Sequence, residues 1–278
     1  MGREVNLVDL IAANMISPDG WKAYIIGNMD DGTLASVPGW LVQLTGHEVD
    51  LSYWERSLKP PFDPWCERIP RDGHEIWALR SHVFDGVQNA SEVRARAIPL
   101  IQRLNGALAM DSEPLSFQAV MRIHDKGGWD LEYFIEGTAN VRIRSAMATA
   151  IGEVRDTQGN LIPPSPPKPS TAQMWIEAAE KDGAIADMLV FAGRADNWPD
   201  IYKALELAKL LVGGKDNLLK LLGDLSEECK NMGETANSHR HARPNRPPPF
   251  PTSLTEAKPL LGYIVRTVLT YRLASTCG

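Results

Sequence analysis

The chain has 278 residues, of which 44% are hydrophobic and 23% are charged, and its formal net charge is −6. These values are typical of globular proteins and exclude a chain that is disordered throughout. The length favours two domains, each able to bury its own core. No apolar run approaches the roughly 20 residues needed to span a bilayer, and three cysteines form no disulfide framework. We therefore expect a cytoplasmic protein that makes no use of a membrane.

Charge is distributed unevenly along the chain. Residues 1–160 hold 15 Lys and Arg against 22 Asp and Glu, whereas residues 238–278 hold six against one. A basic C-terminal end is typical of a site for anions such as phosphate. The same charges would also neutralise an acidic body or stabilise the C-termini of helices, and the sequence leaves both interpretations open.

Residues 1–155 are predicted to form a mixed α+β domain. Apolar patterning indicates strands at 21–26, 40–44 and 75–80, and short helices at 7–16 and 51–58. Asn89 and Glu92 then form an N-cap motif that opens a helix to about residue 109, in which Pro99 should introduce a kink or a break. Six of the eight tryptophans precede residue 130, which indicates aromatic anchors in the core or, alternatively, the lining of a ligand cleft.

The clearest local signal in this half is a β-hairpin. Apolar residues alternate over 117–123 and again over 129–135, and the turn residues 125–128 separate the two runs. The alternating residues of the first run share one face: Phe117, Ala119, Met121 and Ile123. Residues 141–144 alternate as well and predict a third strand, so we expect an antiparallel sheet.

The second half is predicted to be helical. Residues 156–170 contain five prolines between 163 and 169, which is typical of a stiff linker, or of a segment that binds an aromatic groove. Residues 171–278 then form an all-α domain. Capping motifs and apolar patterning place its helices after Ser170, at 184–191, after Asn197, at 217–222, at 226–236 and after Ser253.

Several familiar motifs begin in this chain but are incomplete. Gly213–Lys215 suggests a phosphate-binding loop, but Lys209 and Asp216 occupy positions that need Gly and Ser or Thr. His47 and His74 each precede a glutamate, yet neither has the second histidine of a zinc protease. These features therefore predict no enzyme class.

Residues 236–251 read ANSHRHARPNRPPPFP and place a basic cluster where a helix gives way to a proline-rich loop. Four of its side chains are the candidates for binding nucleic acid or another anion: His239, Arg240, Arg243 and Arg246. His239 and His241 lie about 200° apart around a helix, and no third ligand is near in sequence. We therefore expect no metal site and no cofactor.

Asn237 and His241, followed by a proline-rich loop and a capped final helix, resemble the end of a HEPN-type helical domain. The family pattern is Arg, a polar residue, three variable residues and His, and Ala236 stands at the arginine position here. The resemblance covers residues 198–273 and implies a prokaryotic protein linked to RNA cleavage, nucleotide transfer, stress or defence. In a catalytic version, His241 would be the base, Asn237 would occupy the polar position of the motif, and Arg240 or Arg243 would supply the cation that is missing at Ala236.

We predict a non-catalytic interaction protein, because no complete catalytic motif is present. Its basic C-terminal surface would contact a protein partner or a second copy of the chain, with nucleic acid as a further candidate. One alternative is a metal-independent ribonuclease or nucleotide-modifying enzyme of HEPN type. Another is a structural subunit of a larger assembly, without chemistry at either end.

Overall fold

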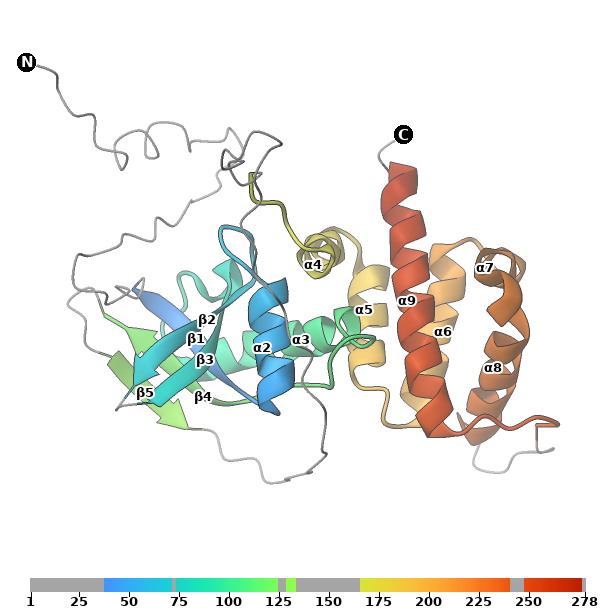
Figure 1. Ribbon diagram of the computed structural model, residues 1–278, viewed down its shortest axis with the longest axis horizontal. Coiled ribbons are helices and arrows are strands. Elements are labelled where there is room, and N and C mark those ends of the chain that lie inside the picture. Colours follow the sequence, from blue (N-terminus) through green and yellow to red (C-terminus); the bar gives the residue numbers. More distant parts are fainter. Residues whose placement is uncertain (1–37, 72–73, 125–128, 134–165, 241–247, 277–278) are drawn as a thin grey trace, which may run out of the picture.

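The computed structural model describes five stretches of the chain: residues 38–71, 74–124, 129–133, 166–240 and 248–276 (Figure 1). The protein is α+β, as the sequence predicts, with an antiparallel sheet in the first half and helices in the second. The elements expected at 7–16, 21–26 and 141–144 lie outside the described residues, as does most of the proline-rich segment.

The sheet has five strands in the order β2-β3-β1-β4-β5, and every neighbouring pair is antiparallel. The strands are β1 (Gly39–Thr45), β2 (Trp65–Arg71), β3 (His74–Arg80), β4 (Ser116–Ile123) and β5 (Trp129–Tyr133). The predicted hairpin is confirmed, because β4 and β5 pair in a register that opposes Ile123 to Trp129.

Strand β2 escapes the sequence analysis because it contains a proline. Pro70 opposes Glu75 of β3 and has no N–H to donate. A proline is tolerated in a strand at the edge of a sheet, and β2 is an edge strand. Its place at the edge is a property of the assembled sheet, which the local pattern does not reveal.

A β-bulge in β4 changes the side of the sheet to which Phe117 belongs. Gln43 pairs with Ala119 but Leu44 pairs with Phe117, so one residue of β4 is extra. Since side chains alternate along a strand, this insertion moves Phe117 to the main core, whereas Met121 belongs to a second, small cluster. The prediction that Phe117 and Met121 share a face is therefore wrong.

The first half also contains α2 (Glu48–Ser57), the short η1 (His82–Phe84) and α3 (Ala90–Ala107). Asn89 caps α3 as predicted, because its side chain accepts a hydrogen bond of 2.9 Å from the Glu92 N–H. Pro99 does not break α3. Leu100 and Leu104 are buried beyond it, and burial of such residues offsets the roughly 3 kcal/mol that an internal proline costs.

The helical half follows the predicted order. Its elements are α4 (Thr171–Lys181), α5 (Gly183–Gly193), α6 (Trp198–Leu211), α7 (Lys215–Leu222), η2 (Gly223–Leu225), α8 (Ser226–Arg240) and α9 (Leu254–Thr276). Ser170 and Gln173 form the predicted capping box, whereas α8 continues past its expected end at residue 236 to Arg240. Among the described helices, none is both long and apolar enough to cross a membrane.

One continuous core joins the sheet to the helices. It includes Val42 of β1, Leu104 of α3 and Val268 of α9, all fully buried. Trp54 and Trp175 belong to it as well, with exposed fractions of 0% and 2%, which confirms these two as aromatic anchors. The halves on either side of the proline-rich segment therefore pack against each other, as Figure 1 shows for α3 and α5.

The two halves meet where two glycines allow α3 and α5 to touch. A Cβ added to Gly106 of α3 would lie 2.1 Å from the carbonyl oxygen of Leu189. A Cβ added to Gly193 at the end of α5 would lie 2.0 Å from the carbonyl oxygen of Gln102. In both cases the obstacle is backbone, which cannot rotate away as a side chain can.

We predict that Gly106→Ala destabilises the protein. The new methyl group must push α3 and α5 apart, and overpacking of this kind typically costs about 1–3 kcal/mol or more of unfolding free energy. Urea denaturation would measure the change. Gly183→Ala is the matched control, because a Cβ at this exposed residue of α5 meets no atom within 4 Å. Equal stability of the two variants would contradict the proposed close approach of the helices.

Candidate functional site

The structure describes only part of the basic cluster predicted from the sequence. Asn237 and His239 lie exposed on the last turns of α8, and Arg240 is the last residue of that helix. The Arg240 side chain is not among the described parts, and His241, Arg243 and Arg246 lie outside the described residues. Whether an arginine converges with Asn237 therefore stays a prediction.

His239 is held by an aromatic partner that the sequence analysis did not identify as a site residue. Its ring stacks on Trp198, with centroids 5.4 Å apart and planes inclined by 8°. Trp198 is the first residue of α6, capped by Asn197, and the start of α6 lies at the same end of the helical half as the end of α8 (Figure 1). Flat ring surfaces therefore gather at this end.

A further aromatic ring, that of Phe250, belongs to the segment just before α9. The Thr252 N–H donates to the hydroxyl oxygen of Thr235 over 3.1 Å, which places this segment against the last turns of α8. Phe250, two residues earlier, is 70% exposed. We call the group formed by Trp198, His239 and Phe250 the aromatic end of the helical half.

A groove of about 260 Å³ runs between α6, α7 and α8 and reaches Asn237. Its charged lining residues are three lysines, Lys209, Lys215 and Lys230, and two glutamates, Glu206 and Glu234. Lys209 pairs with Glu206 at 2.6 Å and Lys230 pairs with Glu227, whereas Lys215 has no ion-pair partner within the described ranges. We call this feature the lysine groove. It offers ammonium groups spaced along a channel that leads toward the aromatic end.

Cys229 lies in the wall of the lysine groove but is poorly suited to nucleophilic chemistry. Burial raises the pKa of its thiol, and the nearby ammonium groups of Lys209 and Lys215 only partly oppose that rise. The reactive form of cysteine is the thiolate, which a raised pKa disfavours. Burial likewise raises the pKa of Cys66, in agreement with its predicted structural role.

Part of the basic C-terminal charge is neutralised by the acidic body. Along α9, Lys258 pairs with Asp196 and Arg266 pairs with Asp111. Arg272 approaches Asp182 at 3.5 Å. These ion pairs fit the interpretation in which the basic end compensates acidic charge.

A separate cluster joins two segments of the first half to α4 of the second. The His82 imidazole contacts Asp63 through Nδ1 at 2.7 Å and Glu180 of α4 through Nε2 at 3.4 Å. Asp63 also accepts hydrogen bonds from the His82 N–H at 2.7 Å and the Ser81 hydroxyl at 3.0 Å. The hydrogen bond to Asp63 raises the pKa of His82, with help from the charges of Asp63 and Glu180, against the opposing effect of burial.

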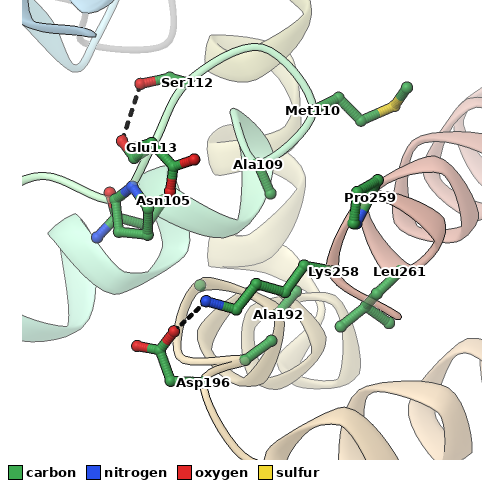
Figure 2. Close-up of a pocket in the computed structure, with 14 residues that line it drawn as sticks. Asn105, Ala109, Met110, Ser112, Glu113, Ala192, Asp196, Lys258, Pro259 and Leu261 are labelled. Atoms are coloured by element: carbon green, nitrogen blue, oxygen red, sulfur yellow. Dashed lines mark hydrogen bonds and ion pairs between the residues drawn. The ribbon is translucent and has the colours of Figure 1, made fainter. Parts of the chain in front are cut away.

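The cavity between α3, α5 and α9 has a volume of about 170 Å³, and Asn105, Asp196 and Lys258 of its lining bond within the chain (Figure 2). Asn105 accepts from the Leu115 N–H at 2.8 Å and donates to the Leu115 carbonyl at 2.9 Å. Lys258 points toward Asp196, with which it forms an ion pair. We interpret this cavity as a structural junction, because these side chains already bond to other parts of the chain that pack around it.

Comparison of the chain with protein-family models, curated proteins and solved structures finds no match. Function is therefore inferred from the geometry of the sites themselves.

We predict that His82 makes the stability of the protein pH-dependent. Because the folded state raises the pKa of His82 above its ordinary value of 6.5, the charged imidazole stabilises the fold. That contribution is complete below about pH 6.5 and is lost as the pH rises through the higher pKa of the folded state. The unfolding free energy of the wild type minus that of His82→Gln should therefore shrink as the pH rises from about 6 to 8.

Urea denaturation in buffers that contain a chelator would measure this difference at each pH. The chelator removes metal ions, which bind the neutral imidazole in place of its proton. A difference that stays constant or grows with pH would contradict the assignment.

Proposed function

We propose that this protein is a binding protein that accepts single-stranded nucleic acid at the aromatic end and along the lysine groove. The observation that carries the proposal is the stacked pair of Trp198 and His239 beside a groove lined by Lys209, Lys215 and Lys230. Aromatic platforms joined to a cationic channel are the usual means of holding unpaired bases together with their phosphates.

The two features would divide the work of binding. Each base that stacks on an aromatic side chain contributes about 1–3 kcal/mol, with little dependence on sequence. The ammonium groups would release counterions from the phosphates, which makes the affinity fall as salt rises. The net charge of −6 opposes binding elsewhere on the surface, so the interaction should be local.

The environment of Ala236 favours binding over catalysis. The HEPN-type resemblance needs an arginine at this position, but Ala236 is fully buried in α8, whereas its neighbour Asn237 is exposed and lines the groove. Successive helical residues point about 100° apart, so a side chain at 236 would point into the core. A catalytic version would therefore depend on Arg240 or Arg243 for its cation.

We predict that Trp198→Ala weakens binding to a fluorescein-labelled oligouridine by about 5–150-fold, the range that corresponds to the removal of one stacked base. Fluorescence anisotropy at low salt would measure the dissociation constant. Phe250→Ala, which removes a mostly exposed ring, should also weaken binding without risk to the fold. Tyr271→Ala on α9 is the matched control, because Tyr271 is 46% exposed and lies outside the aromatic end.

The same titrations distinguish the alternatives. Undiminished affinity in both Trp198→Ala and Phe250→Ala would refute the aromatic end as the binding surface. Absence of binding at low salt would leave a protein partner or a larger assembly as the function. Cleavage of the RNA in chelator-treated buffer, abolished by His241→Ala, would instead establish the ribonuclease.

We predict that neutralising the cations flattens the salt dependence of binding. Lys215→Gln and Lys230→Gln should each reduce the slope of log affinity against log salt by about one for every phosphate that the variant no longer neutralises. Arg240→Ala and Arg243→Ala should do the same if these residues extend the groove. Lys181→Gln is the control, because Lys181 pairs with Glu177 on α4, outside the groove. Equal slopes in all variants would contradict the electrostatic part of the proposal.

A further inference from the structure

Asp63, His82 and Glu180 enclose one position beside a pocket of about 230 Å³. One donor atom from each lies within 4.8 Å of the other two. We propose that these three side chains bind a divalent transition-metal ion, for which Zn²⁺ is the best match. This inference is independent of the proposed nucleic-acid site, which lies on other elements of the chain.

Asp63 is held in place more firmly than a surface carboxylate. Its side chain is 13% exposed, and its two oxygens accept from the His82 N–H, the His82 imidazole and the Ser81 hydroxyl. Ser81 is itself buried. The hydrogen bonds from the His82 N–H and the Ser81 hydroxyl can remain when a metal binds, whereas the imidazole would change from a donor to a ligand. Outer hydrogen bonds of this kind orient a carboxylate before the metal arrives, which lowers the entropy cost of binding.

The loop that carries Asp63 is attached to the helix that carries Glu180. The side-chain amide of Gln173 in α4 donates to three loop carbonyls, those of Lys59 at 2.9 Å, Phe62 at 3.0 Å and Pro64 at 2.9 Å. Gln173 is 2% exposed, so these hydrogen bonds form in a site with little access to water. The donors therefore come from segments whose relative position is set by a buried clamp.

The donor set matches zinc in number and type. Zinc binds imidazole nitrogen at about 2.0–2.1 Å and carboxylate oxygen at about 2.0–2.2 Å, which places tetrahedral ligands roughly 3.3 Å apart. His82 gives a metal ion one nitrogen, and its Nδ1 lies 2.7 Å from Asp63, whereas the 3.4 Å contact with Glu180 is made by Nε2 on the other side of the ring. The three donor atoms, within 4.8 Å of one another, therefore reach the tetrahedral separation once Glu180 moves toward the nitrogen that binds the ion. Glu180 is one-third exposed and can adjust its rotamer.

Three protein ligands would leave a fourth position open to the pocket. This arrangement is the one that zinc adopts where it also holds a water molecule or a small ligand. Imidazole favours zinc and its neighbours in the first transition series, whereas Mg²⁺ and Ca²⁺ prefer sites made of oxygen alone. Zn²⁺ should therefore bind in preference to Mg²⁺.

Titration of the full-length, chelator-stripped protein with Zn²⁺ against a chromophoric chelator tests this site. We expect one equivalent to bind, with His82→Ala, Asp63→Asn and Glu180→Gln each weakening the affinity at least tenfold. Ser81→Ala removes a hydrogen bond to Asp63 together with the cap that accepts from the Val83 N–H, and it should weaken the affinity about 10–100-fold, as the removal of an outer partner of a metal ligand typically does. Co²⁺ in place of Zn²⁺ should give visible absorption bands that disappear in His82→Ala.

Glu177→Gln is the matched control, because Glu177 lies on the same helix and lines the same pocket but is not one of the three donors. Its affinity for Zn²⁺ should stay at the wild-type level. Circular dichroism of each metal-free variant checks that it is folded, and Glu180→Gln alters an exposed residue of α4. Failure of the wild type to compete with the chelator, or wild-type affinity in folded Glu180→Gln and His82→Ala, would overturn the proposal.

Discussion

The close approach of α3 and α5 is the constraint on which the rest of the structure depends. Gly106 and Gly193 leave no space for a side chain, so the two helix backbones meet directly. Helix α3 packs against the sheet, and α5 packs against α4, α6 and α9. The contact between α3 and α5 therefore sets the orientation of the helical half relative to the sheet. That orientation in turn determines which loops of the first half contact which helices of the second.

Gln173 shows how one residue serves local and tertiary structure together. Its carbonyl oxygen accepts from the Ser170 N–H as part of the capping box that starts α4. Its amide nitrogen meanwhile holds the three carbonyls of the loop before β2. The start of α4 and the position of Asp63 are thus coupled, because the same side chain must satisfy both.

The structure shows how the basic residues of the helical half are used, which composition alone does not reveal. The cations of α9 are used to attach that helix to acidic residues of the α3 loop and of the segments flanking α5. The lysines of α6, α7 and α8 instead surround a groove. Similar side chains therefore attach a helix in one place and line a groove in another. The carboxylates paired with the α9 cations lie on other segments of the chain, whereas those paired with Lys209 and Lys230 lie on the same helix as the lysine.

The sequence alone determined the α+β class, the β4–β5 hairpin and the starts of most described helices, because capping residues and apolar periodicity act over a few neighbouring positions. It did not reveal the edge strand β2, the bulge that turns Phe117, or the continuity of α3 through Pro99. Nor did it reveal the stacking of Trp198 on His239 or the meeting of Asp63, His82 and Glu180. Those features were decided by the tertiary structure, since each depends on contacts between residues far apart in the chain.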